Sequence, residues 1–294
     1  MDFLQPRSIA EALDAAQAVP GAVPITGGTD VMVEMNFGRA RPPALLDLTH
    51  VPELTRWEHT GGYLRVGAAV TYARLITELS GALPGLAMAS RTVGSPQIRN
   101  RGTLGGNLGS ASPAGDTHPV LLASGAVVEA VSAHGSRHIP AGSFYTGVKR
   151  HALRPGELIR SVLIPPAPGP QQFCKIGTRN AMVIAVASFA LELDPPARRA
   201  GTGIGSAAPT PRRAADAEAF LEGELGEHGL WDCPRDLSEA VMGRFGELAA
   251  AAAAPIDDVR GSARYRRHAV AVMAQRALRW AWRDYLGQHE RKAG

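Results

Sequence analysis

The chain has 294 residues, of which 45% are hydrophobic and 20% are charged, and its formal net charge at pH 7 is +4. This composition excludes a disordered or fibrous protein, and the length allows two domains with a sizeable core. The positive charges form no stripe with interleaved aromatic residues, so we predict no binding to nucleic acid.

Two features of the sequence bear on location. The cysteines, Cys174 and Cys233, are too few and too far apart to hold an iron–sulfur cluster or a zinc ion by themselves. They do not suggest a disulfide framework either, which favours a reducing compartment. The N-terminal sequence has an acid at position 2 and lacks an apolar signal region, and no apolar run reaches membrane-spanning length. We therefore expect a cytoplasmic protein that does not enter a membrane.

The N-terminal part alternates helices and strands. Ser8, three residues before Glu11, forms a capping box that predicts the start of a helix. Residues 21–35 predict a short strand, a glycine turn and a second amphipathic element. Residues 43–51 predict a buried strand, and residues 61–71 alternate in polarity as a half-buried strand does.

Further elements lead up to a proline-rich segment. Thr71 is the expected cap of a helix, and Pro84 is expected to start another. Residues 119–132 predict a helix that runs into a strand, and residues 156–166 predict a strand closed by two prolines. Residues 165–172 (PPAPGPQQ) predict a linker, because prolines are poor in any regular element.

The composition changes beyond this linker. Residues 182–194 and 198–211 predict strands. Residues 212–224, 236–254 and 262–286 have strong helical character. We therefore expect an N-terminal α/β part that ends near residue 168 and a C-terminal part made of a small sheet and helices.

Two segments rich in glycine follow one pattern: residues 25–30 (ITGGTD, the first glycine segment) and residues 102–107 (GTLGGN, the second glycine segment). Paired glycines let a ligand approach backbone N–H groups, which favour phosphate oxygens. Neither segment matches a P-loop or a Rossmann fingerprint. The residues alone predict either simple tight turns or a phosphate-bearing cofactor held by amides. Polar side chains able to add hydrogen bonds are Thr29, Thr103, Asn107, Ser110, Ser112 and, for a sugar hydroxyl, Asp116.

The chain resembles the FAD-binding subunits of the molybdenum hydroxylases, which include the medium subunit of carbon monoxide dehydrogenase and the flavin domain of xanthine dehydrogenase. Four blocks carry the resemblance in order: residues 26–32, 95–126, 144–165 and 258–278. It implies an α+β fold of the molybdopterin-dehydrogenase FAD-binding (PCMH-type) kind. Two α/β subdomains would clasp FAD, and a three-stranded sheet with a helical bundle would follow. The expected boundaries are residues 1–57, 58–168 and 173–290.

The resemblance also implies which residues hold the cofactor. Those expected to bind the FAD pyrophosphate through their amides are Ile25, Thr26, Gly27, Gly28, Thr29 and Asp30. Those expected to contact the phosphates and the ribityl chain are Thr103, Gly105, Gly106, Asn107 and Ser110. Asp116 would bind the adenosine ribose, Leu153 would lie by the adenine, and Lys175 would line the flavin edge. We expect no catalytic side chain and no metal ligand.

The partners implied are a small subunit with two [2Fe–2S] clusters and a large molybdopterin subunit. We expect non-covalent FAD, because the first glycine segment has no histidine for a covalent bond. Val93 stands near the place where xanthine dehydrogenase has an aromatic residue over the flavin, so NAD, oxygen, a quinone or a protein all remain as acceptors. Two alternatives stay open: a stand-alone FAD oxidoreductase of the same superfamily, and a scaffold without flavin.

The last predicted helix raises two smaller questions. Its arginines favour either a solvated face or a docking face for an acidic partner, and they are Arg264, Arg266, Arg267, Arg276, Arg279 and Arg283. Its aromatic residues, Trp280, Trp282 and Tyr285, are expected to pack in the core. His118 is expected to have a structural role at a helix start rather than a catalytic one.

Overall fold

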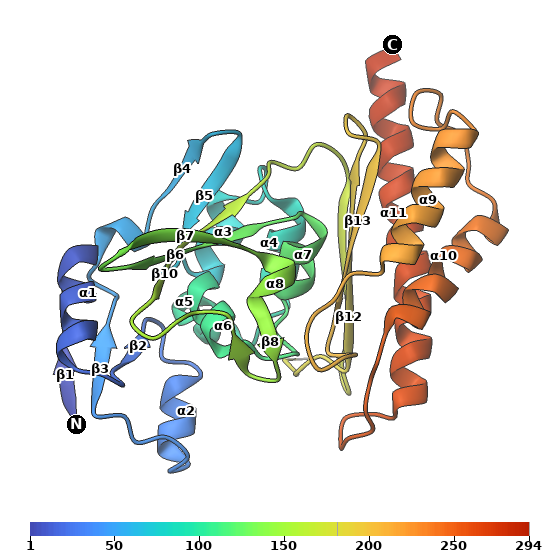
Figure 1. Cartoon of the computed structure of the whole chain (residues 1–294). Helices are drawn as coiled ribbons and strands as arrows, with labels where there is room; N and C mark the ends of the chain where they lie inside the picture. The colour runs from blue at the N-terminus through green and yellow to red at the C-terminus, as the bar shows by residue number, and fades with distance from the viewer. Residues whose placement is uncertain (181, 294) are drawn as a thin grey trace.

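The computed structural model describes residues 1–180 and 182–293, and it has three parts in a row (Figure 1). The N-terminal part contains β1 (Asp2–Leu4), α1 (Ile9–Ala18), β2 (Val23–Ile25), α2 (Val31–Asn36) and β3 (Ala44–Asp47). Its strands form a parallel sheet in the order β1-β3-β2. The central strand β3 is buried along its whole length, as its apolar sequence predicts.

The predicted cap of α1 is confirmed. The Ser8 hydroxyl accepts a hydrogen bond from the Glu11 N–H at 3.2 Å. The Glu11 carboxylate in turn accepts from the Arg7 N–H at 2.8 Å, one residue earlier than in a standard capping box. Local sequence therefore determines where this helix begins.

The middle part is built on a five-stranded antiparallel sheet with the order β4-β5-β10-β6-β7. A short 3-10 helix, Pro52–Leu54, precedes it. Its strands are β4 (Trp57–Thr60), β5 (Tyr63–Gly67), β6 (Val127–Ser132), β7 (Gly135–Pro140) and β10 (Leu158–Ile164). The small hairpin is β8 (Tyr145–Gly147) with β9 (Arg150–His151).

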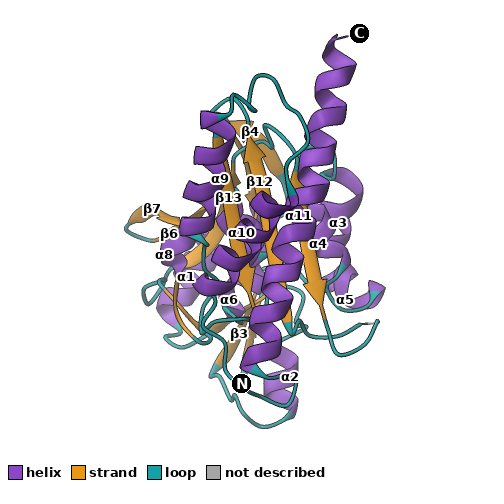
Figure 2. Ribbon diagram, turned by 90° about the vertical axis from the view of Figure 1, so that its right-hand side faces the viewer, coloured by secondary structure: helices purple, strands orange, loops and turns teal. Residues whose placement is uncertain are grey.

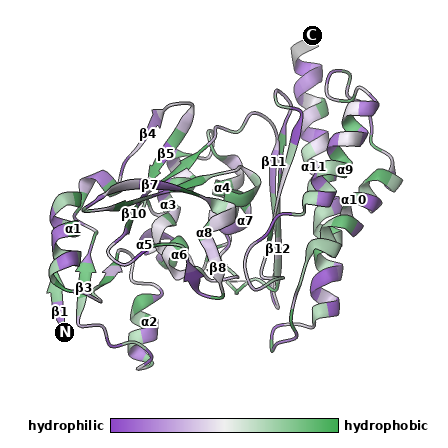
Figure 3. Ribbon diagram, viewed as in Figure 1, coloured by the Kyte–Doolittle hydropathy of each residue, from purple (hydrophilic) through white to green (hydrophobic). Residues whose placement is uncertain are grey.

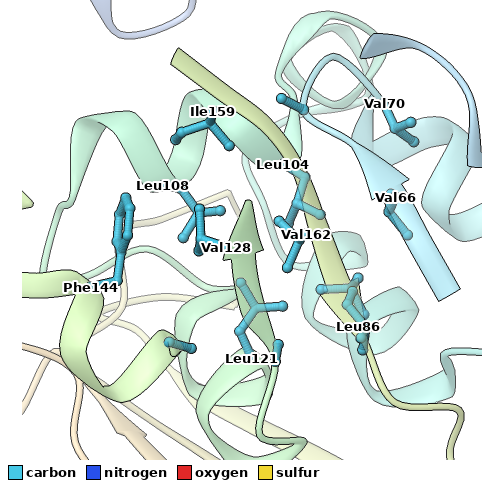
Figure 4. Close-up of a cluster of buried hydrophobic side chains, with 14 of the residues drawn as sticks. Val66, Val70, Leu86, Leu104, Leu108, Leu121, Val128, Phe144, Ile159 and Val162 are labelled. Carbon is cyan, nitrogen blue, oxygen red and sulfur yellow. The ribbon is translucent and has the colours of Figure 1, made fainter. Parts of the chain in front are cut away.

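Helices cover one face of this sheet and enclose the main core. They are α3 (Tyr72–Glu78), α4 (Pro84–Arg91), α5 (Pro96–Arg101), α6 (Leu104–Ser110), α7 (His118–Ala123) and α8 (Ala141–Phe144). Leu104 and Leu108 of α6 pack beside Val128 and Val162 of the sheet (Figure 4). Thr71 caps α3 by accepting from the Arg74 N–H, as predicted.

The C-terminal part contains an antiparallel sheet, and helices cover both faces of this sheet (Figures 1 and 2). Its strands are β11 (Gln171–Ile176), β12 (Ala187–Asp194) and β13 (Arg199–Gly205), and its helices are α9 (Ala215–Glu227), α10 (Glu239–Ala252) and α11 (Ala263–Ala293). Helices α9 and α11 contact one face of the sheet, whereas α7 and α4 of the middle part contact the other. The sheet therefore joins the two parts.

Glycines allow α7 to lie directly on β13. Gly201, Gly203 and Gly205 alternate along the strand, so they point to one face. A Cβ at Gly201 would overlap the Ala123 carbonyl oxygen, and one at Gly203 would overlap that of Pro119. The backbones approach this closely only because these positions lack side chains.

Two sequence expectations are corrected by these elements. Gln171 and Gln172 belong to β11 rather than to the linker, because both pair with β12. The second glycine segment, for which the residues alone allowed a tight turn, runs into helix α6, because Thr103 caps this helix and its leucines are buried. Helix propensity alone disfavours a helix with glycines at positions 105, 106 and 109. The division at residues 1–57, 58–168 and 173–290 stays our proposal, although β4 begins at Trp57.

Helix α11 has hydrophilic and hydrophobic residues along its length, as an amphipathic helix does (Figure 3). Trp282 and Tyr285 are buried as expected, but Trp280 is 43% exposed because it lies on the outer face. Arg266 is also buried: its guanidinium donates to Asp258 and to two carbonyl oxygens. It therefore belongs neither to a solvated face nor to a docking face.

Candidate functional site

A cleft of about 1520 Å³ lies where the three parts meet. This volume exceeds the range of about 300–1,000 Å³ of pockets for drug-sized ligands, and it suits an extended dinucleotide. Every residue that the sequence analysis assigned to the cofactor lines this cleft, from the first glycine segment through the second to Asp116, Leu153 and Lys175. The structure thus brings together residues up to 150 positions apart in the sequence (Ile25 to Lys175).

The first glycine segment offers backbone donors to the cleft. It links β2 to α2, and Gly28 has a φ of +73°, which favours glycine. Within the described part of the chain, the N–H groups from Gly27 to Asp30 have no acceptor. Buried or half-buried amides normally find a partner. These four groups are therefore available to an anionic ligand.

The two glycine segments are joined along a seam. The hydroxyls of Thr26 and Thr103 lie 2.8 Å apart in a hydrogen bond. A Cβ at Gly27 would overlap the Arg101 carbonyl oxygen, so only glycine permits this approach. A Cβ at Gly105 would lie 2.7 Å from the Ala68 carbonyl oxygen, which gives this glycine a packing role.

Gly106 differs from these packed glycines because a Cβ there would meet no backbone atom of another segment. A Cβ there would meet only the Thr103 hydroxyl at 3.0 Å and the Thr26 hydroxyl at 3.7 Å. The Gly106 N–H donates to the Thr103 hydroxyl at 3.0 Å. Next to it, the Asn107 side-chain oxygen accepts from Thr117 at 2.5 Å, which fixes the amide group at the cleft wall. The missing side chain at Gly106 leaves room for a ligand.

Asp116 and Lys175 form a buried ion pair across the boundary with the C-terminal part. The Lys175 ammonium donates to Asp116 at 2.6 Å and to the Thr92 carbonyl oxygen at 3.0 Å. The Thr92 hydroxyl donates to the same carboxylate oxygen at 3.2 Å. Burial raises the pKa of Asp116 to about 6, although the Lys175 charge opposes this change.

The two oxygens of the Asp116 carboxylate differ in their hydrogen bonds. Asp116 Oδ1 is buried and has no hydrogen-bond partner among the described residues. A buried unpaired carboxylate oxygen is costly and calls for a donor, such as a ligand hydroxyl. The sequence analysis assigned Asp116 and Lys175 to different ends of a cofactor, but in the structure they contact each other. They therefore face the same stretch of the cleft.

The β8–β9 hairpin of the middle part contacts the N-terminal part at the edge of the cleft. Lys149, at the turn between β8 and β9, donates to Glu34 of α2 at 2.8 Å. Burial raises the pKa of Asp30 nearby, and the Lys149 charge opposes this change. Because the Lys149 side chain is 61% exposed, water and salt screen this ion pair.

His118 has the structural role that the sequence analysis favoured. It is the first residue of α7 and is completely buried. Its Nδ1 and the Tyr145 hydroxyl lie 2.8 Å apart in a hydrogen bond. Burial lowers the pKa of His118 to about 3, so the ring is neutral at pH 7. It does not line the cleft.

The sequence analysis missed three residues of the site: Tyr72 and Lys149 line the cleft, and Thr92 contacts the Asp116–Lys175 pair beside it. Tyr72 is the first residue of a helix, which hides it among ordinary core aromatics. Thr92 carries no motif, and its role depends on a partner 83 residues away. Lys149 could have been found from its place between two short strand-like runs within the third resembling block. Among the described residues, no group of three or more His, Cys, Asp and Glu could hold a metal ion.

Comparisons with known proteins agree with this geometry. The family model described as "FAD binding domain in molybdopterin dehydrogenase" matches residues 1–167, and that described as "CO dehydrogenase flavoprotein C-terminal domain" matches residues 172–281. The chain is 32% identical to the nicotine 6-hydroxylase medium subunit of Paenarthrobacter nicotinovorans, over 94% of this chain and 95% of the relative. It is 30% identical to the carbon monoxide dehydrogenase medium chain of Afipia carboxidovorans, over 94% and 95%.

A solved structure supports the same conclusion. A chain of the reconstituted CO dehydrogenase from Oligotropha carboxidovorans superposes with a TM-score of 0.88 at 30% identity, over 97% of this chain and 98% of the other. The fold and cleft thus define a flavoprotein component of an oxidoreductase. The chain belongs to the family of FAD-binding domains in molybdopterin dehydrogenases and, in it, is similar to the medium subunits of molybdenum hydroxylases.

Proposed function

We propose that this chain holds FAD non-covalently in the cleft and acts as the electron-transferring subunit of a molybdenum hydroxylase. Electrons would arrive from [2Fe–2S] clusters on a small partner subunit, after a large molybdopterin subunit has oxidised the substrate. They would leave to an external acceptor. When bound, FAD supplies the coupling between one-electron and two-electron transfer.

The observation that supports this proposal most is the pair of glycine segments facing one cleft. Four amides of the first segment have no acceptor in the described part of the chain, and Gly106 of the second leaves an opening where a Cβ would stand. Amides in such a turn suit the pyrophosphate of a dinucleotide. The residues present therefore fit the cofactor that the family model names.

Side chains would complete the site. Asp116 Oδ1, unpaired among the described residues, would accept from a ribose or ribityl hydroxyl. Its other oxygen is held by Thr92 and Lys175, so the carboxylate is fixed in place before a ligand arrives. Lys175 brings a positive charge beside the cofactor, and Leu153 offers an apolar surface to the adenine.

Partners are part of the proposal because the chain lacks the means to relay electrons alone. It has two cysteines, one buried in β11 and one exposed. A cluster needs four thiolates, so the chain has too few. The relatives carry names such as medium subunit, medium chain and complex subunit alpha. No helix among the described residues combines the length and apolarity needed to cross a membrane. We place the assembled complex in the cytoplasm.

The acceptor remains NAD, oxygen, a quinone or a protein. The alternatives of a stand-alone FAD oxidoreductase and of a flavin-free scaffold make different predictions. A stand-alone enzyme would reduce or oxidise a substrate without other subunits, and a scaffold would bind no flavin.

A visible spectrum of the purified chain with FAD tests the proposal. Bound flavin should appear at one equivalent and be released by acid, since no covalent bond is expected. Asp116→Ala should weaken binding at least about 10-fold, because a hydrogen bond to a charged group contributes about 1.5–3 kcal/mol. Asp14→Ala, at an exposed position of α1, is the matched control. A folded chain that stays colourless with excess FAD, alone and with its partner subunits, would rule the proposal out.

A further inference from the structure

Tyr72 stands out among the residues of the cleft. It is the first residue of α3, is 4% exposed, and lines the cleft. Of the described residues lining the cleft, it alone is a phenylalanine, tyrosine or tryptophan. The proposed function gives this side chain no role.

The ring of Tyr72 supports the seam between the glycine segments. A Cβ at Gly102 would lie 2.8 Å from Cε2 of this ring, so the ring lies directly against the backbone of the second segment. The Tyr72 N–H also donates to the Gly102 carbonyl oxygen at 3.0 Å. Gly27 of the first segment packs in turn on Arg101 and Gly102. The ring thus lies against the second segment at the point where the first segment packs on it.

The hydroxyl of Tyr72 has a different environment from its ring. Within the described part of the chain, no hydrogen bond to this hydroxyl is formed, and the group is not sealed inside the protein. Burial, followed by the carboxylates of Asp116 and Asp30, raises the pKa of the phenol well above its usual value. The hydroxyl therefore keeps its proton and lies near the carboxylates of Asp116 and Asp30.

A buried tyrosine usually pairs its hydroxyl. In this molecule Tyr145 does so with His118, and Tyr285 does so with the Trp231 carbonyl oxygen. Tyr72 departs from this pattern in the cleft, where a ligand can supply the partner.

We propose that Tyr72 is a direct cofactor contact: its hydroxyl donates a hydrogen bond to an oxygen of the FAD pyrophosphate or ribityl chain, while its ring supports the seam. This inference rests on the proposed function, because it takes FAD to be the ligand of the cleft. It assigns to one side chain a role that neither glycine segment fills.

Tyr72→Phe tests the inference in the full-length chain, because it removes the hydroxyl and keeps the ring. FAD titration followed by flavin fluorescence should show a Kd raised about 3- to 10-fold, the effect of one lost hydrogen bond. The Tm of the protein without FAD should not change, because the hydroxyl makes no bond in that state. The increase in Tm on adding FAD should be smaller than in the wild type.

Tyr63→Phe is the matched control, since it makes the same change at an exposed end of β5 outside the cleft. An unchanged Kd for Tyr72→Phe, with wild-type binding intact, would overturn the inference alone. A Tm lowered equally with and without FAD would also overturn it, because the hydroxyl would then act on the fold. Failure of the wild type to bind FAD would instead contradict the proposed function.

Discussion

Two regions of this molecule use glycine for opposite purposes. In β13, Gly201, Gly203 and Gly205 let the backbone of α7 lie against the sheet, so the space that side chains would occupy is filled by protein. At Gly106, and at the open amides of the first glycine segment, the space is left to the cleft. A run such as GTGIG is therefore no weaker as a glycine pattern than TLGGN, yet only the second points to a ligand.

The difference lies in what surrounds the glycine rather than in the glycine itself. Gly27 belongs to both cases: its missing Cβ admits the Arg101 carbonyl oxygen, while its N–H has no acceptor in the described part of the chain. Substitutions at these positions should therefore separate loss of folding from loss of FAD binding.

The largest effect is expected for Gly203→Val. Its side chain would collide with the Pro119 backbone, which cannot move without displacing α7. We expect the free energy of unfolding to fall by about 3 kcal/mol or more, the upper range for overpacking. Urea unfolding followed by circular dichroism measures it. Gly223→Ala, at an open position of α9, is the control and should stabilise the protein slightly. Equal stability of the two variants would contradict the packing role of β13.

Gly106→Ala should show the opposite behaviour. Because the new methyl group meets only two threonine hydroxyls, the protein without FAD should keep its stability to within about 1 kcal/mol. The affinity for FAD should fall about 5- to 150-fold, since a methyl group in a filled site costs about 1–3 kcal/mol. Calorimetric titration measures the affinity. Wild-type affinity in this variant would show that no ligand approaches Gly106.

How much of this could be predicted from the sequence depends on the range of the interactions. The caps at Ser8 and Thr71 were predicted because cap and helix are adjacent in the chain. The assignment of Gln171 to a linker was wrong, because its amide is fixed by Gly85 and by Glu192, 86 and 21 residues away. Helix α6 was missed since its glycines hide the burial of its leucines.

The site shows the same division. The glycine segments were identified because each is a local pattern, and all the residues assigned to the cofactor do line one cleft. The contact between Asp116 and Lys175 joins residues 59 positions apart, and no local pattern indicates it. Tyr72 was missed because a tyrosine at a helix start is usually a core residue.

The stability of the sheet that joins the middle and C-terminal parts should depend on pH. Glu192 lies in β12, where Gln171 donates to it, and burial raises its pKa from 4.5 to about 7. The folded protein therefore holds this proton to a higher pH than the unfolded chain does. The stability that the protonated group contributes is complete below about pH 4.5 and is lost as the pH rises through 7.

Between pH 5 and pH 8, the wild type should thus lose about 2 kcal/mol relative to Glu192→Gln, which keeps an acceptor for Gln171 but does not titrate. Urea unfolding of both proteins at several pH values measures this difference. A constant difference across that range would mean that Glu192 titrates normally.

The smallest effect is expected where the cleft is closed by an exposed ion pair. Lys149→Ala should speed FAD dissociation about 2- to 4-fold at low salt, because exposed pairs contribute less than about 1 kcal/mol. The effect should disappear in about 1 M salt, where the screening length is about 3 Å. Stopped-flow fluorescence measures the rate. Arg198→Ala, which breaks an exposed pair with Asp232 far from the cleft, should leave the rate unchanged.

Amide hydrogen exchange with and without FAD tests the central claim most directly. The account predicts that FAD slows exchange at the open amides of residues 27–30 and at the Gly106 region, while β13 exchanges slowly in both states. If FAD binds and protects other segments but leaves both glycine segments unchanged, then these segments do not hold the cofactor and the account of the site is contradicted.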